Sequence, residues 1–356
     1  VVTLDNSGSV AVNNTAGTST LTGAGLWASN TSTGGISINN TGLVTGKGDW
    51  KNLFYGIYAS AYNGVVNVNT GNINLKTVGP NRGIEAKSAK KVTVNVTGNI
   101  YALGEKTTSI GVFIEPVTIN NVAVGSYEIN VSAGKSILSN GMSIGVNSPD
   151  GGVINLGSNS RVDNYDHSPE NYAIYTSIGK DIINSQALIT GIIDTNSGDD
   201  QIHFSAGALD GSVSMGAGSD QLLVSGSFNS SNVSLFDGQT GDDTLEFRGA
   251  SGNFYGSRIT NWESIKLTNN ANLIFSGGEL TLDTSSFSDG IERGLLIDSS
   301  STLNISNSFV LNSPVNNAGT INLRSNTVGK TFTINGNYTG SNGVLLLNAK
   351  LNGDEN

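Results

Sequence analysis

Apolar residues recur at every second position along most of the chain, where they alternate with Ser, Thr, Asn and Gly. This alternation predicts short β-strands that direct one face toward a core. No apolar run reaches about 18 residues, the length that a membrane-spanning helix needs. The pattern therefore predicts an all-β chain without a helical membrane span.

A short block recurs at intervals of about 30 residues, and a second alternating stretch follows each copy. The block is a glycine, an apolar residue, any residue, and a small or apolar residue, and it begins at Gly25, Gly56, Gly83, Gly111 and Gly141. Strand repeats of this length without helices are typical of solenoids, in which each coil stacks on the next. We therefore predict a single-domain, right-handed parallel β-helix over residues 1–356, with roughly 14 coils.

Changes in the sequence of the repeat divide this predicted rod into three parts. Residues 1–190 carry the glycine block, and residues 249–356 form the C-terminal coils. Between them, residues 191–248 form shorter coils with a Gly-x-Asp turn, in which Asp200, Asp220 and Asp243 align. Because Asp accepts backbone hydrogen bonds in turns, turn formation is the simplest role for these aspartates.

The amino-acid composition excludes several kinds of site and partner. The chain has 47 glycines, no cysteine, 13% charged residues and a net charge of −10. Gly suits tight corners, and the absence of Cys excludes disulfides and cysteine-ligated zinc. The 28 acidic residues outnumber the 18 basic ones. This argues against nucleic acid as a partner, because proteins that bind nucleic acid neutralise its phosphates with basic residues.

Three stretches carry a family resemblance. One is GIYAS with VVNVNTGNI in residues 56–73, and another is the Gly-Asp-Asp coils followed by ITNWESIKL in residues 259–267. The third is NNAGTINL in residues 316–323 with the sequence from Thr331 to Asn356. Together they resemble the passenger domains of bacterial autotransporters, and the last resembles the passenger end that leads into a chaperone segment and a membrane barrel.

The resemblance implies a secreted or bacterial cell-surface protein whose precursor also includes its own C-terminal barrel. Among autotransporter passengers, the chain most resembles the short, host-directed ones, which include angiogenic factors and adhesins. These imply a non-enzymatic virulence factor without a cofactor that binds a host-cell surface receptor, such as a growth-factor receptor. Two alternatives stay open: a self-associating adhesin that mediates aggregation or attachment, and a glycan or ester hydrolase built on a β-helix.

The hydrolase alternative has one matching string, Gly-Met-Ser-Ile-Gly at residues 141–145. A nucleophile elbow needs a strand, a sharp turn and a helix, and no helix is expected at this position. The repeat instead aligns Ser143 with Trp27, Tyr58, Glu85 and Phe113, which predicts an ordinary coil position. We therefore expect no catalytic residue.

Two groups of residues are candidates for binding a partner. A run of bases suits an acidic host protein or a sulfated glycan. It comprises Lys76, Arg82, Lys87, Lys90, Lys91 and Lys106. The irregular stretch from Asp163 to Tyr175 predicts a projecting loop, in which Tyr165, His167 and Tyr172 are candidate contacts.

Acidic residues are concentrated in the Gly-x-Asp coils, since the stretch from Asp181 to Glu246 contains no Lys or Arg. Stacked carboxylates repel one another unless they are solvated or a cation lies between them. We expect no bound metal, and calcium at Asp200, Asp220 and Asp243 is the alternative.

Overall fold

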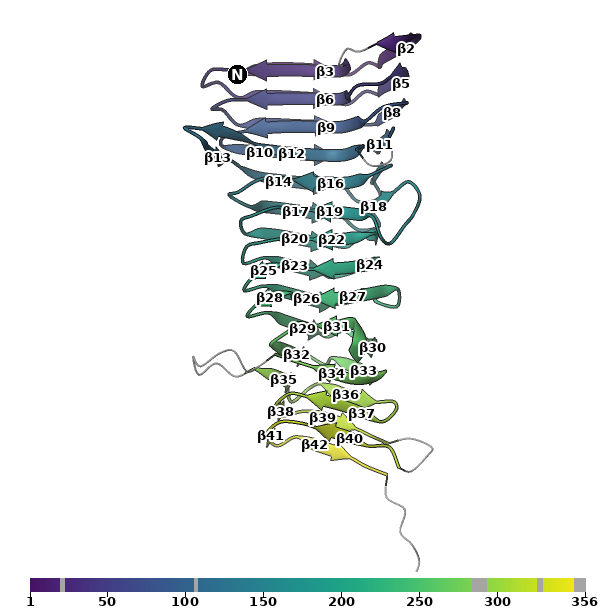
Figure 1. Cartoon of the computed structure of the whole chain (residues 1–356), viewed down its shortest axis with the longest axis vertical. Helices are drawn as coiled ribbons and strands as arrows, with labels where there is room; N and C mark the ends of the chain where they lie inside the picture. The colour runs from purple at the N-terminus through teal and green to yellow at the C-terminus, as the bar shows by residue number, and fades with distance from the viewer. Residues whose placement is uncertain (20–22, 106–107, 284–292, 325–328, 349–356) are drawn as a thin grey trace, which may run out of the picture.

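The computed structural model describes residues 1–19, 23–105, 108–283, 293–324 and 329–348. Within these ranges the chain consists of short strands and one three-residue 3-10 helix, η1 (Gly256–Arg258). The described part has no helix that is both long and apolar enough to cross a membrane. Figure 1 shows the coils stacked along one axis as an elongated rod.

One long parallel sheet runs along the rod and receives one strand from each coil. Its fourteen strands are β1 (Val2–Asn6), β4 (Ile36–Asn40), β7 (Val66–Thr70), β10 (Lys91–Val96), β14 (Ser126–Val131), β17 (Gly152–Leu156), β20 (Asp181–Ser185), β23 (Gln201–Phe204), β26 (Gln221–Ser225), β29 (Thr244–Arg248), β32 (Ser264–Thr268), β35 (Gly294–Ile297), β38 (Val315–Asn317) and β41 (Tyr338–Gly340).

The other sides of the N-terminal coils are formed by eighteen further strands. These are β2 (Val10–Ser19), β3 (Gly23–Asn30), β5 (Val44–Trp50), β6 (Phe54–Ala61), β8 (Ile73–Thr77), β9 (Asn81–Ser88), β11 (Ile100–Leu103), β12 (Ile110–Ile119), β13 (Val122–Val124), β15 (Ser136–Ser139), β16 (Met142–Val146), β18 (Arg161–Asn164), β19 (Tyr172–Tyr175), β21 (Leu188–Thr190), β22 (Ile192–Asp194), β24 (Ala208–Ser214), β27 (Val233–Asp237) and β31 (Ile259–Thr260).

New sheets replace these in the C-terminal coils. One contains β30 (Ser251–Tyr255), β33 (Asn272–Ser276), β36 (Thr302–Ile305), β39 (Thr320–Asn322) and β42 (Val344–Leu346), and another contains β34 (Gly278–Thr281), β37 (Phe309–Asn312) and β40 (Phe332–Ile334). The short strands β25 (Ala217–Gly218) and β28 (Thr240–Gly241) pair at one corner.

The register explains the alternation in the sequence. Ile36 pairs with Val66 and Val66 with Val92, so the apolar residues of successive coils stack as buried columns. All strand pairs of the described chain are parallel except β12 with β13. The predicted all-β parallel β-helix is therefore confirmed, and fourteen strands in the long sheet agree with roughly 14 coils.

An amide ladder covers the outer face of the long sheet in its first seven coils. The Nδ2 of Asn69 donates to Asn39 Oδ1, and the Nδ2 of Asn95 donates to Asn69 Oδ1, both at 2.7 Å. The complete ladder comprises Asp5, Asn39, Asn69, Asn95, Asn130, Asn155 and Asn184. It accounts for part of the high Asn content, since each rung bonds to the next coil.

Candidate functional site: a projecting hairpin beside an aromatic and ionic surface

Most of the predicted basic residues lie on the first coils, but the structure pairs several of them internally. Lys91 Nζ lies 2.6 Å from Glu128 Oε2, and Arg82 and Lys87 both contact Glu85. Lys76 and Lys90 are exposed and form no ion pair among the described residues. Lys106 lies outside the described residues.

Glu85 is the centre of this ionic cluster. It is only 3% exposed, and its Oε1 lies 3.0 Å from Lys87 Nζ, which also contacts Glu115. Burial raises the pKa of Glu85, although the hydrogen bond from Lys87 opposes this effect. Burial alone would lower the pKa of Lys87, but its hydrogen bonds to Glu115 and Glu85 raise it overall. These ion pairs hold the side chains of Arg82 and Lys87 against acidic residues, so the two bases do not form a free basic surface.

Aromatic rings continue the same surface toward the N-terminus. The ring of Trp27 stacks on that of Tyr58 with centroids 3.9 Å apart, and Tyr55 contacts both rings edge-on. Lys87 Nζ lies 5.8 Å from the Tyr58 ring centroid, within cation–π range. Trp27 is 52% exposed, so much of the indole surface faces solvent. We call Trp27, Tyr55, Tyr58, Arg82, Glu85, Lys87 and Glu115 the aromatic–ionic face.

A hairpin arm, residues 116–124, projects beside this face. After pairing with β9, strand β12 extends beyond the rod and turns back antiparallel as β13. Asn120 and Asn121 have φ angles of 51° and 64°, which suit the two central residues of a type I′ turn. Figure 1 shows β13 projecting past the edge of the stacked coils.

The arm is uncharged and partly apolar, with Val122 59% exposed. Its base is held firmly: the Gly125 N–H donates to Asp150 Oδ2 at 2.7 Å, and the Ser126 N–H donates to the Lys90 carbonyl at 2.9 Å. The outer edge of β13 has no strand partner in the described chain. Exposed strand edges of this kind can pair with another chain.

The predicted loop is present between β18 and β19 and projects from the opposite edge of the rod in Figure 1. Tyr165 is 53% exposed and Tyr172 is 40% exposed. His167 is tied to the rod, because its Nδ1 lies 2.5 Å from Oδ2 of the buried Asp163. The Nη2 of Arg161 also lies 2.5 Å from Asp163 Oδ2.

The predicted alignment of the Gly-x-Asp coils is confirmed, but the role assigned to the aspartates is wrong. Because Gln201 pairs with Gln221 and Gln221 with Thr244, the preceding residues Asp200, Asp220 and Asp243 stack in register. All three are fully buried, and Asp220 Oδ1 accepts the backbone N–H of Asp200, on the previous coil. These carboxylates therefore bridge coils and do not form local turns.

The same residues bear on the calcium alternative. Among the described residues, no group of three or more His, Cys, Asp or Glu side chains gathers as metal ligands would. Oδ1 of Asp200, Asp220 and Asp243 each accepts a backbone N–H of the neighbouring coil. The described geometry offers no calcium cage.

The alignment of Ser143 is also corrected. Val112 pairs with Ile144 and Phe113 with Gly145, so Ser143 lies opposite Gly111 instead of Phe113. The residue is fully buried and its Oγ donates to the carbonyl oxygen of Asp163. The misalignment arises because the repeat glycine matches Gly141, which lies two residues too early.

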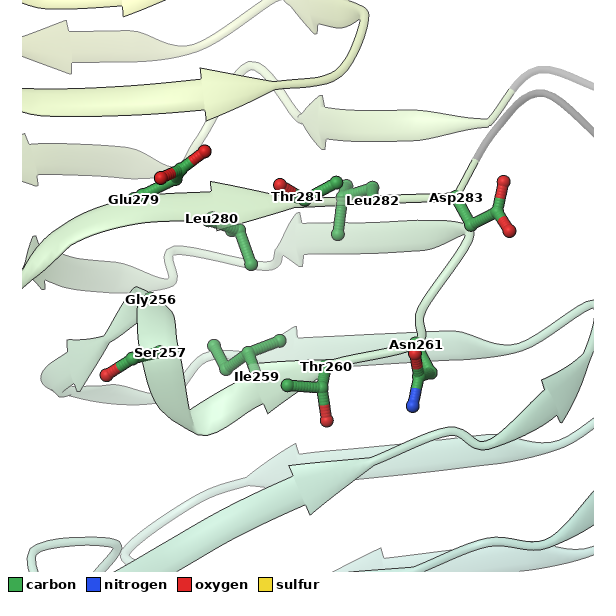
Figure 2. Close-up of a pocket in the computed structure, with 10 residues that line it drawn as sticks. All are labelled: Gly256, Ser257, Ile259, Thr260, Asn261, Glu279, Leu280, Thr281, Leu282 and Asp283. Carbon is green, nitrogen blue, oxygen red and sulfur yellow. The ribbon is translucent and has the colours of Figure 1, made fainter.

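A cleft of about 650 Å³ opens where the side sheets change. Strand β31 pairs only with β27 and β34 only with β37, so the two strands face each other without hydrogen bonds (Figure 2). Glu279 and Asp283 lie at opposite ends of this cleft, in Figure 2. Its lining contains no histidine and no closely paired carboxylates.

Sequence reasoning missed both the arm and the partners of the basic residues. Glu115 and Glu128 are distant from Lys87 and Lys91 in sequence and become neighbours only through coil stacking. The arm had a local signal, since Asn120-Asn121 lies between two alternating stretches, as in a hairpin.

Comparison of the chain with protein-family models, curated proteins and solved structures gives no match.

Proposed function

We propose that this chain is the secreted or surface-exposed passenger of an autotransporter, and a non-enzymatic virulence factor that binds a protein on the surface of a host cell. The fold supports this proposal, because a stack of coils provides a rigid support for a projecting element. The resemblance to angiogenic passengers makes a growth-factor receptor the first partner to test.

The hairpin arm is the observation that carries the proposal. Every other pairing in the described rod is parallel, and only here does the chain leave the stack to form an antiparallel hairpin. The arm exposes Val122 and an unpaired strand edge, and Lys90 lies exposed near its base. An apolar hairpin beside an exposed lysine suits a protein partner that offers a strand edge and an acidic side chain.

The direct test places a charge on the arm. Val122→Asp should weaken binding to intact animal cells at least about tenfold, because the carboxylate would be desolvated at the interface. Val78→Asp is the matched control, since Val78 is equally exposed, at 61% against 59%, on another part of the rod. Flow cytometry with labelled protein measures binding, and thermal melting verifies that both variants fold.

Equal binding by the two variants would contradict the proposal. Loss of binding by Val78→Asp alone would place the interface elsewhere on the rod.

Self-association remains a second proposal, which rests on the amide ladder. Asn39, Asn69, Asn95 and Asn155 each use one N–H and one lone pair within the ladder, and their remaining N–H groups and lone pairs can bond to a second rod. The second N–H of Asn130 instead donates to Glu128 of the same rod. This function requires oligomers of the purified chain whose size grows with concentration, whereas receptor binding does not. Sedimentation velocity over a concentration series distinguishes the two.

A further inference from the structure

The central coils contain a buried column of five carboxyl groups. The backbone N–H of each of the four aspartates donates to a carboxylate oxygen on the next coil: Asp181 to Asp200 at 2.7 Å, and Asp200 to Asp220 at 2.7 Å. Asp220 donates to Asp243 at 2.8 Å, and Asp243 to Glu263 at 2.6 Å. None of the five is more than 4% exposed.

The second carboxylate oxygen of each aspartate in the column lacks a hydrogen-bond partner. Oδ2 of Asp181, Asp200, Asp220 and Asp243 is buried and has no hydrogen-bond partner. A buried carboxylate without a partner for its charge is costly, and the group avoids this cost by taking up a proton. The proton can reside on Oδ2 while Oδ1 continues to accept the N–H of the neighbouring coil.

Few charges near the column could offset ionised carboxylates. Lys180 favours the ionised form of Asp200, and Arg293 is held by Asp242 at 2.8 Å. The phenol of Tyr127 donates to Asp181 Oδ1 at 2.8 Å. The other neighbouring charges are acidic and disfavour ionisation: Asp199, Asp237, Asp242 and Asp283.

We propose that this carboxyl column is a proton-binding element, which makes the central coils more stable in mildly acidic solution than in neutral or alkaline solution.

The direction of the pH dependence follows from linkage. Burial raises the pKa of Asp220 to about 8, of Asp243 and Asp181 to about 7, and of Asp200 to about 6. In the unfolded chain these carboxyls titrate near 4. The folded state therefore binds more protons between about pH 4 and pH 8, and stability falls as pH rises through that range.

Asp220→Asn tests the proposal, with Asp199→Asn as its matched control. Asn at residue 220 keeps an oxygen for the Asp200 N–H but cannot ionise. Asp199 is the adjacent exposed carboxylate, and its Oδ1 accepts the Ser219 N–H at 2.9 Å, a bond that Asn also keeps.

The melting temperature of the parent chain should fall by several degrees between pH 5 and pH 8.5. The fall should be clearly smaller in Asp220→Asn, and only slightly smaller in Asp199→Asn, which removes one of the acidic neighbours that disfavour ionisation of the column. A parent melting temperature that is flat or rises over this range, or an equal fall in all three proteins, would overturn the proposal. Full recovery at pH 8.5 on adding calcium would also overturn it, because the column would then bind a metal.

Proton uptake provides a test that needs no variant. Folding at pH 7 should take up about two to three protons, because the pKa of Glu263 is also raised to about 7, and calorimetry in buffers with different ionisation enthalpies measures this uptake. Zero uptake, or proton release on folding, would contradict the proposal even if Asp220→Asn failed to fold.

Discussion

At the residue scale, the close approach of neighbouring coils requires glycine at the repeat positions. A Cβ on Gly56 would lie 2.6 Å from the Gly83 carbonyl oxygen, and a Cβ on Gly83 would lie 2.4 Å from that of Gly111. These contacts are too short for any side chain. The sequence repeat marks these glycines correctly, but it cannot show that Ser143 continues the column at the next coil.

Gly83→Ala should therefore destabilise the rod by about 2 kcal/mol, because the new methyl group overpacks against backbone and against Ile100. Gly8→Ala is the control, since the nearest atom to its Cβ is 3.9 Å away. Its effect should stay within about 0.5 kcal/mol. Denaturant unfolding measures both, and similar losses would show that the glycine column is not tightly packed.

At the element scale, stacking brings together charges that are distant in sequence. The bases of residues 76–106 resemble a free positive surface when only the nearby acids are considered. Strands β12 and β14 bring Glu115 and Glu128 alongside Lys87 and Lys91, and much of that positive charge is paired. No count of local charges can show this, because the pairing depends on coil register and on the hairpin insertion.

Lys87→Met should destabilise the chain by about 2 kcal/mol, because the buried Glu85 loses its closest cation. The cost is below that of a fully buried pair, since Lys87 and Glu115 are partly exposed. Adding Glu85→Gln should recover part of the loss, as measured by chemical unfolding of the single and double variants.

Lys91→Met is the comparison, because the Lys91–Glu128 pair is more exposed, and it should cost less than about 1 kcal/mol. If Lys87→Met were equally mild, or if Glu85→Gln added to the loss, the ionic cluster would not stabilise this face.

At the scale of the whole molecule, the fold was predictable and the position of the proposed binding surface was not. Period and alternation determine the fold, since every coil repeats the columns of the previous one. The arm proposed to bind a partner lies where the repeat is interrupted, and an interruption of the repeat cannot be predicted from its period. The arm and the loop from Asp163 to Tyr175 are two such interruptions, on opposite edges of the rod (Figure 1).

The most direct measurement compares these two projections for binding to the same intact cells. In one variant, residues 118–123 are replaced by Asn-Gly, which joins the paired Val117 and Val124 through a two-residue turn. In the other, Tyr165 and Tyr172 are both changed to Ser. We predict that the shortened arm abolishes saturable binding while the loop variant binds like the parent chain. Retained binding by the shortened arm, with loss in the loop variant, would contradict the proposal that the arm is the binding site.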